Sequence, residues 1–350
     1  MGRSRLVLGN VEQDRVPPFL PLGNKYAVIA LPVSIGQSVP DHDDFGAGMH
    51  ATRGLGFPLP EHWREWIGSI AVSLLDEEEH LCLWVTSSAK HPELLDNVNE
   101  RLKIRVQTWL RGLLLTARAF GTSGQLTMLT GANGSDGLGI RERSSPERPI
   151  SNNGVLSRAI EHQHIRDSAA LGDTILTIHE SGGKYRRLRY MIEGFYRGAR
   201  TVDAAERIHE FVRCVEGCIL PPHGETRSKF LSRTELFIGP RQRDWAGVLY
   251  DIRSAVEHLN DQLSVLAKPT ERESILTVLR HAYEVQELAR YCLNRILSRP
   301  QLLQFFVEDS ELQRFWELTH VERCSLWGDP LDLPGVSREF SPDYVQQNGW

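Results

Sequence analysis

The segment from Trp245 to Leu266 constrains the fold of this chain more than any other. Its apolar residues recur at intervals of three and four, which is the pattern of an amphipathic α-helix. At about 100° per residue, Arg253 lies on one edge of the apolar stripe and His258 on the other, about 140° away. We therefore predict one helix over residues 245–266, with a stripe made of Trp245, Val248, Leu249, Ile252, Ala255, Val256, Leu259, Leu263 and Leu266.

Arg253 and His258 are the two residue types that cleavage of RNA without a metal requires. A neutral imidazole can accept the proton of a ribose 2′-hydroxyl, and a guanidinium can hold the phosphate on which negative charge develops. Two residues on opposite edges of one helix reach a single phosphate poorly. Two copies of the helix packed across a two-fold axis would bring Arg253 of one copy beside His258 of the other, so we expect a homodimer.

The residues from Tyr250 to His258, YDIRSAVEH, resemble the R-x4-6-H signature of HEPN domains, most closely the Y-D-x-R-S-x-x-x-H variant of ApeA-like and related large HEPN proteins. Arg253 and His258 match the catalytic pair of that family, and Ser254 matches the polar residue after the arginine. Many active members have Asn, Asp or His where this chain has Ser254, and a frequent glycine is replaced by Leu259.

This resemblance implies an all-helical and usually dimeric domain, commonly a metal-independent ribonuclease of toxin, antiviral-defence or RNA-processing systems. It also implies supporting roles for Tyr250 and Asp251 within the motif. HEPN domains often place a polar or acidic side chain near the active cleft from the helix before the motif, and Glu216 is the candidate here. We therefore expect an endoribonuclease acting on RNA, with no cofactor and no metal.

A second interpretation of the same residues is a non-catalytic helical module for dimerisation or partner binding. Arg253 and Glu257 are four residues apart and can form a surface ion pair, and Ser254 and His258 have the spacing of a hydrogen-bonded pair. In that case the helix would build only a dimer interface.

Composition and charge narrow the classes of protein further. Of the 350 residues, 41% are hydrophobic and 24% are charged, as in ordinary globular proteins. No apolar run reaches the length of a membrane span and the first residues lack the apolar core of a signal peptide, so we expect a cytoplasmic protein without membrane contact. A net charge of −5 argues against unselective coating of nucleic acid.

Two local clusters of basic residues are candidates for RNA contacts despite the acidic net charge. The first contains Arg186, Arg187 and Arg189, and the second contains Arg227, Lys229 and Arg233. The five cysteines are expected to be reduced core thiols. A metal site at Cys214, Cys218, His209 and His223 is conceivable, but a closed site needs ligands of tighter spacing from two elements.

The pattern along the chain predicts an α+β N-terminal domain followed by an all-α HEPN-like helical bundle. The expected parts are an extended arm at 1–24, a mixed α/β domain at 25–180 that senses a trigger or selects the substrate, the HEPN-like domain at 184–318, and an irregular tail at 319–350. We expect strands at 25–33, 70–75, 80–86, 125–129 and 174–178, a short turn with inward Trp63 and Trp66, loops at 34–60 and 131–139, and helices at 98–120, 185–199, 204–219, 228–237 and 273–297.

Overall fold

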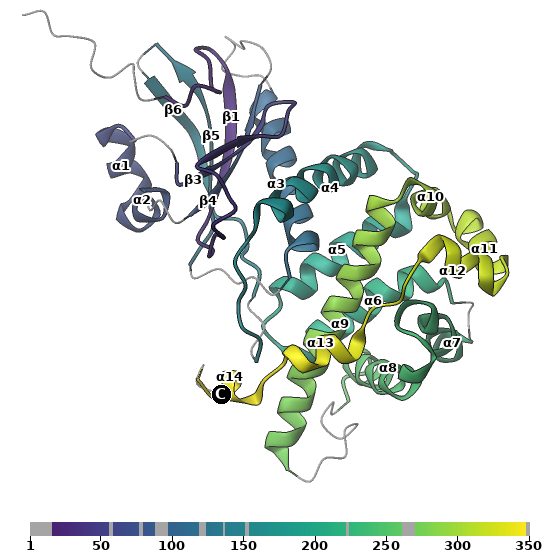
Figure 1. Ribbon diagram of the computed structural model, residues 1–350. Helices are drawn as coiled ribbons and strands as arrows, with labels where there is room; N and C mark the ends of the chain where they lie inside the picture. Colours follow the sequence, from purple (N-terminus) through teal and green to yellow (C-terminus); the bar gives the residue numbers. More distant parts are fainter. Residues whose placement is uncertain are drawn as a thin grey trace, which may run out of the picture. The chain divides into compact units, whose positions relative to one another are not determined.

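The computed structural model describes residues 16–55, 59–76, 80–87, 97–118, 124–135, 137–150, 154–221, 224–260 and 270–347 (Figure 1). The chain divides into two compact units. The first takes in Met1–Gln107 and Ser123–Pro146, and the second takes in Thr108–Thr122 and Glu147–Trp350. A strand-rich first unit and a helical second unit confirm the expected succession of an α+β region and an all-helical region.

The first unit is built on a six-stranded antiparallel sheet with the strand order β2-β3-β4-β1-β5-β6 (Figure 1). The central strand β1 has the sequence KYAVIAL and is buried along its whole length, so both of its faces are covered. Val28 of β1 is opposite Trp84 of β4 on one side and Leu129 of β5 on the other. The strands are β1 (Lys25–Leu31), β2 (His42–Asp44), β3 (Met49–Arg53), β4 (Leu81–Thr86), β5 (Thr127–Gly134) and β6 (Gly137–Ser144).

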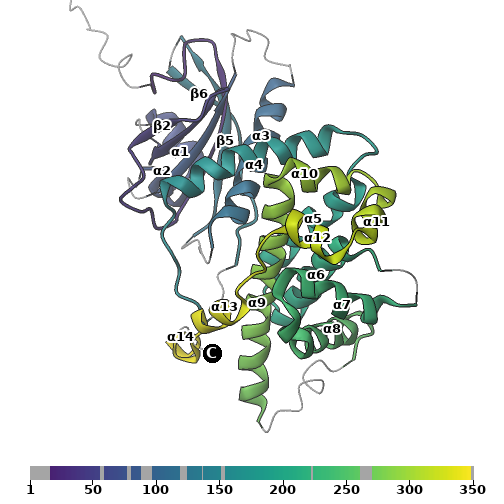
Figure 2. The ribbon, with the colours of Figure 1, turned by 45° about the vertical axis from the view of Figure 1, so that its right-hand side comes forward.

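Helices cover the two faces of this sheet (Figures 1 and 2). On one face Leu75 of α2 packs into a core with Val28 and Trp84. On the other, the α3 side chain of Asn99 donates through Nδ2 to the carbonyl oxygen of Gly131, 3.0 Å away, and so ties the helix to β5. The helices are α1 (Glu61–Ile67), α2 (Ser69–Asp76) and α3 (Val98–Thr116), of which α3 continues into the second unit.

The structure confirms the expected strands at β1, β4 and β5 and the long helix α3, but it corrects two other expectations in this unit. Residues 70–75 lie in helix α2 and not in a strand. The prediction is wrong because a short apolar run has no periodicity that distinguishes a helix from a strand. Residues 131–134 lie in β5 and residues 137–139 lie in β6, where a loop is predicted from the sequence. A Cβ on Gly131 would be 1.9 Å from the carbonyl oxygen of Gly139, so the glycines permit close strand pairing.

Smaller corrections concern the edges of the first unit. The stretch 34–60 was expected to be a loop, yet it contains the strands β2 and β3. Trp66 is 55% exposed and does not pack inward, whereas Trp63 packs against the core. Within the expected N-terminal arm, residues 16–24 form turns and Leu20 is buried in the core, and residues 1–15 lie outside the described residues.

The second unit is a set of helices packed around α9, a helix of 28 residues. Helices α4, α5, α6, α7, α10 and α13 all contact α9 (Figure 2). The helices are α4 (His162–Glu180), α5 (Arg186–Arg200), α6 (Ala204–Ile219), α7 (Thr226–Ile238), α8 (Arg243–Glu257), α9 (Glu271–Ser298), α10 (Pro300–Leu303), α11 (Asp309–Glu317), α12 (His320–Trp327), α13 (Leu333–Glu339) and α14 (Pro342–Gln347), with the 3-10 turns η2 (Pro240–Gln242) and η4 (Gln304–Phe306).

Glycines allow two helix pairs in this unit to approach closely. Where α3 crosses α4, a Cβ on Gly112 would lie 2.3 Å from the carbonyl oxygen of Ser168, and Trp109 Nε1 donates to Ser168 Oγ at 2.8 Å. Where α5 packs against α6, a Cβ on Gly217 would lie 2.2 Å from Cγ of Met191. The backbone of α4 at Gly112, and the side chain of Met191 at Gly217, occupy the space that a side chain would need.

The helices at 185–199, 204–219, 228–237 and 273–297 are confirmed as α5, α6, α7 and α9. The strand expected at 174–178 is wrong, because these residues continue α4, whose buried positions Leu171, Ile175 and Ile178 follow helical spacing. The stretch 319–350, expected to be irregular, contains α12, α13 and α14, and Trp327 is buried there. Helix α4 belongs to the second unit, although the sequence placed it before the boundary at 180–184.

Candidate active site on α6 and α8, and an arginine-lined cavity

Helix α8 carries the motif, and it ends earlier than its apolar pattern predicts. The last helical residue is Glu257, and His258 caps the helix with φ −99° and ψ 10°. Leu259 follows with φ 56°, in the left-handed region that favours glycine, and Asn260 N donates to the carbonyl oxygen of Ala255 at 2.9 Å. The expected helical position of His258 is therefore wrong, and residues 261–269 lie outside the described residues.

Arg253 lies at the centre of a cluster of charged side chains. Its Nη2 is 3.3 Å from Oε2 of Glu216 on α6, and its Nη1 is 2.7 Å from Oε2 of Glu257 on α8. Its guanidinium lies over the ring of Tyr250, with Cζ 5.8 Å from the ring centroid. The Arg253 side chain is only 16% exposed, and its buried Nε has no hydrogen-bond partner among the described residues.

Glu216 enters this cluster from the neighbouring helix α6. Its side chain is 13% exposed, and its buried Oε1 has no partner in the described part of the chain. Burial raises the pKa of Glu216, and the nearby charge of Arg253 opposes that rise without cancelling it. Glu216 therefore binds a proton more readily than an ordinary glutamate.

The structure adds His209, which the sequence did not single out as part of the active site. Its Nε2 is 3.6 Å from Oε2 of Glu257, and its buried Nδ1 has no partner within the described ranges. His209 precedes Glu216 by about two helical turns on α6, so the two share one face. The spacing of seven residues predicts that His209 and Glu216 share a face of α6, but only the packing in the structure shows that this face contacts α8.

The remaining motif residues lie apart from the cluster. His258 is exposed, and its side chain has no hydrogen bond or ion pair with any described residue. The possible side-chain bond between Ser254 and His258 is replaced by a backbone bond, in which His258 N donates to Ser254 O at 3.1 Å. Asp251 accepts two hydrogen bonds of 3.0 Å from Arg227, and these bonds raise the pKa of that guanidinium.

A cavity of about 900 Å³ lies between α5 and α6 and is closed at one end by residues 306–309. Four guanidinium groups line it, and Gly194 and Gly217 contribute no side chain to its wall. Glu216 lines the same cavity. Glu216 thus belongs both to the wall of the cavity and to the cluster around Arg253, and the arginines of the cavity are Arg186, Arg187, Arg197 and Arg213.

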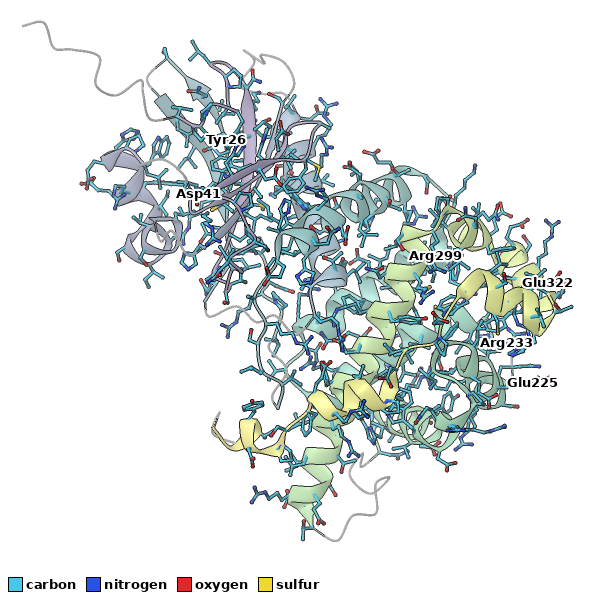
Figure 3. The ribbon with its side chains drawn as sticks, in the orientation of Figure 1. Tyr26, Asp41, Glu225, Arg233, Arg299 and Glu322 are labelled. Atoms are coloured by element: carbon cyan, nitrogen blue, oxygen red, sulfur yellow. The ribbon has the colours of Figure 1, made fainter. Side chains whose placement is uncertain are left out.

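Of the six expected RNA contacts, Arg186 and Arg187 line this cavity and the others do not. Arg189 lies near His179 and helps to lower its pKa, after burial and Arg111. The other three lie on α7. Arg227 is bound to Asp251, Lys229 Nζ is 3.4 Å from Glu225 Oε2, and Arg233 stacks over Trp316, with Cζ 4.7 Å from the ring centroid (Figure 3).

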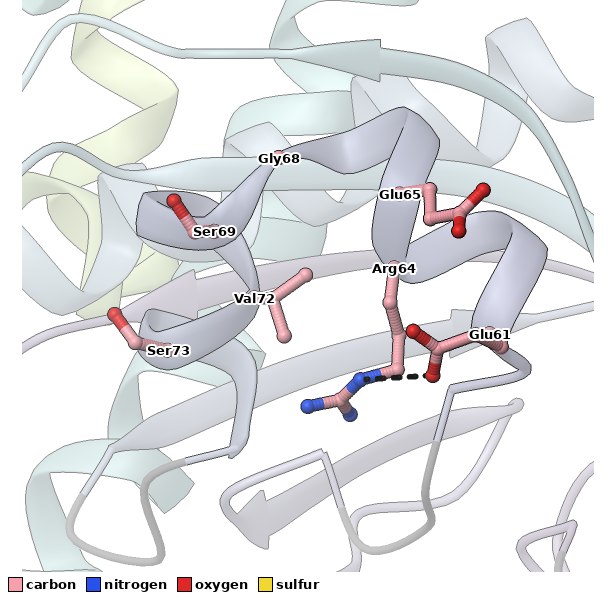
Figure 4. A pocket seen from close by; sticks show the side chains of 7 residues that line it. All are labelled: Glu61, Arg64, Glu65, Gly68, Ser69, Val72 and Ser73. Atoms are coloured by element: carbon pink, nitrogen blue, oxygen red, sulfur yellow. Dashed lines mark ion pairs between the residues drawn. The ribbon is translucent and has the colours of Figure 1, made fainter.

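A second hollow, of about 600 Å³, lies between α1 and α2 in the first unit (Figure 4). Its charged lining residues are one arginine and two glutamates, with Arg64 Nε 3.9 Å from Glu61 Oε2, so the hollow has no excess of positive charge for a phosphate. We therefore do not place the active site there.

Neither unit offers a clear metal site or membrane span in its described residues. No group of three or more His, Cys, Asp or Glu side chains within the described ranges is arranged to hold a metal ion, and His223 lies outside them. Among the described helices, none combines the length and the apolar character needed to cross a bilayer.

The comparisons with protein-family models, curated proteins and solved structures returned no match for this chain.

Proposed function

We propose that this protein is a metal-independent HEPN-type endoribonuclease that cleaves RNA by attack of a ribose 2′-hydroxyl. One observation carries the proposal. The guanidinium of Arg253, the arginine of the motif, is held by Glu216, and Glu216 also lines the arginine-rich cavity. A phosphodiester drawn to that cavity would lie near a guanidinium able to bind the scissile phosphate.

The proposed reaction needs one base and one phosphate-binding group. The imidazole of His258 takes the proton of the 2′-hydroxyl, the oxygen attacks phosphorus, and the 5′-oxygen leaves and takes up a proton from water. The products are a 2′,3′-cyclic phosphate and a free 5′-hydroxyl. Arg253 would bind the phosphate through Nη2 when Glu216 is protonated, because a neutral carboxyl releases that nitrogen, while Nη1 stays paired with Glu257.

The exposed position of His258 supports a homodimer in which this imidazole acts on a phosphate held by the partner's guanidinium. We propose a cytoplasmic role in phage defence or as a toxin, with the first unit sensing the trigger or selecting the RNA. These biological roles rest on the family resemblance alone.

The test is cleavage of a labelled RNA by the full-length protein in excess chelator. Cleavage should persist without metal, leave 2′,3′-cyclic phosphate ends, and be lost in Arg253→Ala and in His258→Ala. Arg243→Ala is the matched control, since Arg243 is on the same helix, is 60% exposed, and lies outside the cluster. Cleavage that needs a divalent cation, or that survives both substitutions, would exclude the proposal.

His209→Ala separates two candidates for the base. Loss of cleavage in His209→Ala with full activity in His258→Ala would assign the base to the imidazole beside Glu257. That result would also remove the need for a partner chain.

A non-catalytic module for dimerisation or partner binding is the second candidate. It is favoured by the two carboxylates that already occupy Arg253. Such a pair of contacts holds a helix interface together without any substrate. A stable dimer by light scattering, with no cleavage of any RNA tested, would select this function.

A further inference from the structure

We propose that His42 on β2 and His50 on β3 form an acid-sensitive contact that holds residues 16–24 on the sheet through the ring of Phe19. At neutral pH this histidine pair shares one hydrogen bond. Uptake of a second proton breaks the hydrogen bond and releases the segment. The proposal concerns the first unit alone, so it would hold equally if the motif on α8 were inert.

The histidine pair lies on the hairpin of β2 and β3, and β2 is an edge strand of the sheet (Figure 2). Asp44 is directly opposite His50 in the antiparallel pairing, and His42 precedes Asp44 by two residues on the same strand. Successive side chains of a strand alternate between its faces, so all three side chains lie on one face of the hairpin. His42 is exposed and His50 is buried, so one imidazole of the pair reaches solvent and the other does not.

The two imidazoles are close enough to share one proton. Nε2 of His42 is 3.5 Å from Nδ1 of His50. In a neutral imidazole one nitrogen donates and the other accepts, so one ring of the pair can donate to the other. A single added proton preserves this bond, because a charged ring still donates to a neutral one. After a second proton both facing nitrogens are donors, and two positive charges repel each other at short distance.

Phe19 covers both imidazoles. Its ring is stacked on His42, with centroids 4.9 Å apart and planes at 8°, and on His50, with centroids 4.3 Å apart and planes at 19°. The next residue, Leu20, is buried in the core of the sheet. An aromatic ring stabilises one cation beside its face, but two imidazolium groups that repel each other cannot both stay beneath Phe19. The stack is thus the part of this segment that protonation disrupts.

The surroundings of His50 favour its neutral form. Burial lowers the pKa of His50, the carboxylate of Asp44 opposes this change without cancelling it, and the charge of His42 adds to the lowering. Asp44 Oδ1 is 3.7 Å from His50 Nδ1. Trp84 of β4 is opposite His50 and Phe19 lies over it, and neither ring ionises in water. Of the described residues, Asp44 and His42 are therefore the titratable groups that act on His50.

The direction of the pH dependence follows from this lowered pKa. Above the ordinary imidazole pKa of about 6.5 the contact is fully formed, and its stabilisation is lost as the pH falls through the lowered value of His50. Opening takes up as many as two protons. The ratio of released to bound segment should therefore rise by up to about a hundredfold per pH unit in this window, against about tenfold for a single titrating imidazole.

Hydrogen–deuterium exchange of the full chain, from about pH 7.5 to about pH 5, tests the proposal. Protection factors are compared, because they remove the pH dependence of the chemical exchange itself. The reporters in the segment are the amides of Leu20, which donates to the carbonyl oxygen of Pro17 at 2.9 Å, and of Gly23, which donates to that of Asn133 at 2.7 Å. We expect their protection to fall more than about tenfold per pH unit below about pH 6.5, while β1 stays protected.

Three variants separate the histidine pair from general effects of acid. His42→Gln keeps a side chain that forms hydrogen bonds but takes up no proton, so the fall in protection should shrink to at most about tenfold per pH unit. His62→Gln is the matched control, since His62 is an exposed histidine of the same unit, on α1, and it should behave as the parent. Phe19→Leu removes the stack and should leave the segment weakly protected at every pH.

Three results would overturn the proposal. The first is protection of residues 16–24 that stays constant over the whole pH range. The second is an equal fall in the parent and in His42→Gln. The third is a parallel loss of protection in β1, which would mean that acid unfolds the whole first unit. If Phe19→Leu fails to fold, His42→Gln still decides the question, because its position is exposed.

Discussion

Replacing Glu287 by alanine should destabilise the second unit severely, because Glu287 forms a buried ion pair with Arg290 and also accepts a hydrogen bond of 2.8 Å from Nε of Arg118. Its side chain is 2% exposed, that of its partner Arg290 is 7% exposed, and the two are in contact on α9. Burial lowers the pKa of Arg290 to about 9, but the group stays charged near neutral pH. Glu287→Ala thus leaves a buried guanidinium whose main remaining bond is to the carbonyl oxygen of Leu114, 2.9 Å away.

The magnitude follows from this burial. Removing one partner of a buried ion pair costs about 3–5 kcal/mol, whereas an exposed pair contributes about 0–1 kcal/mol. Glu311 and Arg314 on α11 are the matched control, since they have the same order and spacing but are 35% and 70% exposed. Glu287→Ala should therefore shift the urea midpoint far more than Glu311→Ala.

Urea unfolding followed by circular dichroism measures both variants. The double substitution Glu287→Met with Arg290→Met should recover part of the loss, because it removes the buried charge at position 290, while Arg118 loses Glu287 and keeps Glu339. Equal small losses in Glu287→Ala and Glu311→Ala would refute the reasoning, as they would mean that water reaches Arg290.

Three further predictions concern packing, pH and a helix cap. Gly112→Ala should cost at least about 1–3 kcal/mol in thermal unfolding, because its Cβ would lie 2.3 Å from a backbone oxygen of Ser168, while Gly183→Ala, with no atom within 4 Å, should be neutral. Burial would raise the pKa of Glu284, but the hydrogen bonds of its carboxylate outweigh burial and lower the pKa. The ionised carboxylate therefore stabilises the fold fully above the ordinary carboxyl pKa, and this stabilisation is lost as the pH falls through the lowered value. The loss in Glu284→Gln should accordingly shrink from neutral pH to about pH 3, and an unchanged difference in urea midpoint would contradict this. Asp203→Ala should cost about 1 kcal/mol, since Asp203 Oδ1 accepts a hydrogen bond from the backbone N–H of Glu206 in the first turn of α6, and Asp203→Ser should retain most of this stabilisation.

Periodicity alone located α8 and the position of Arg253, but it could not locate the end of the helix. The usual stop signal is a glycine in the left-handed conformation, and here Leu259 adopts that conformation instead. The apolar pattern continues past Leu259, so the sequence predicts a longer helix. In the structure Leu259 is about nine-tenths exposed, and the helix has already ended. Because the end of the helix is not predicted, the position of His258 after the last helical residue is not predicted either.

The partners of Arg253 in the candidate site are only partly predictable from the sequence. Glu257 follows from helical spacing, and Glu216 was proposed from the family resemblance. His209 joins the cluster because α6 packs against α8, and no spacing within either helix indicates that contact. The cavity likewise depends on Gly194 and Gly217 from two helices, which become one wall only after folding.

The chain passes between its two units three times, at 107/108, 122/123 and 146/147. Helix α3 is shared by both units, and its second half bonds to α4 through Trp109 and to α9 through the Leu114 carbonyl. The sequence pattern places a domain boundary at residue 184. A fragment that begins there would lack α4 and the second half of α3, and the apolar surfaces that these helices cover would be exposed to solvent. Limited digestion should therefore yield no stable helical piece starting there, and the second unit is best studied without trimming.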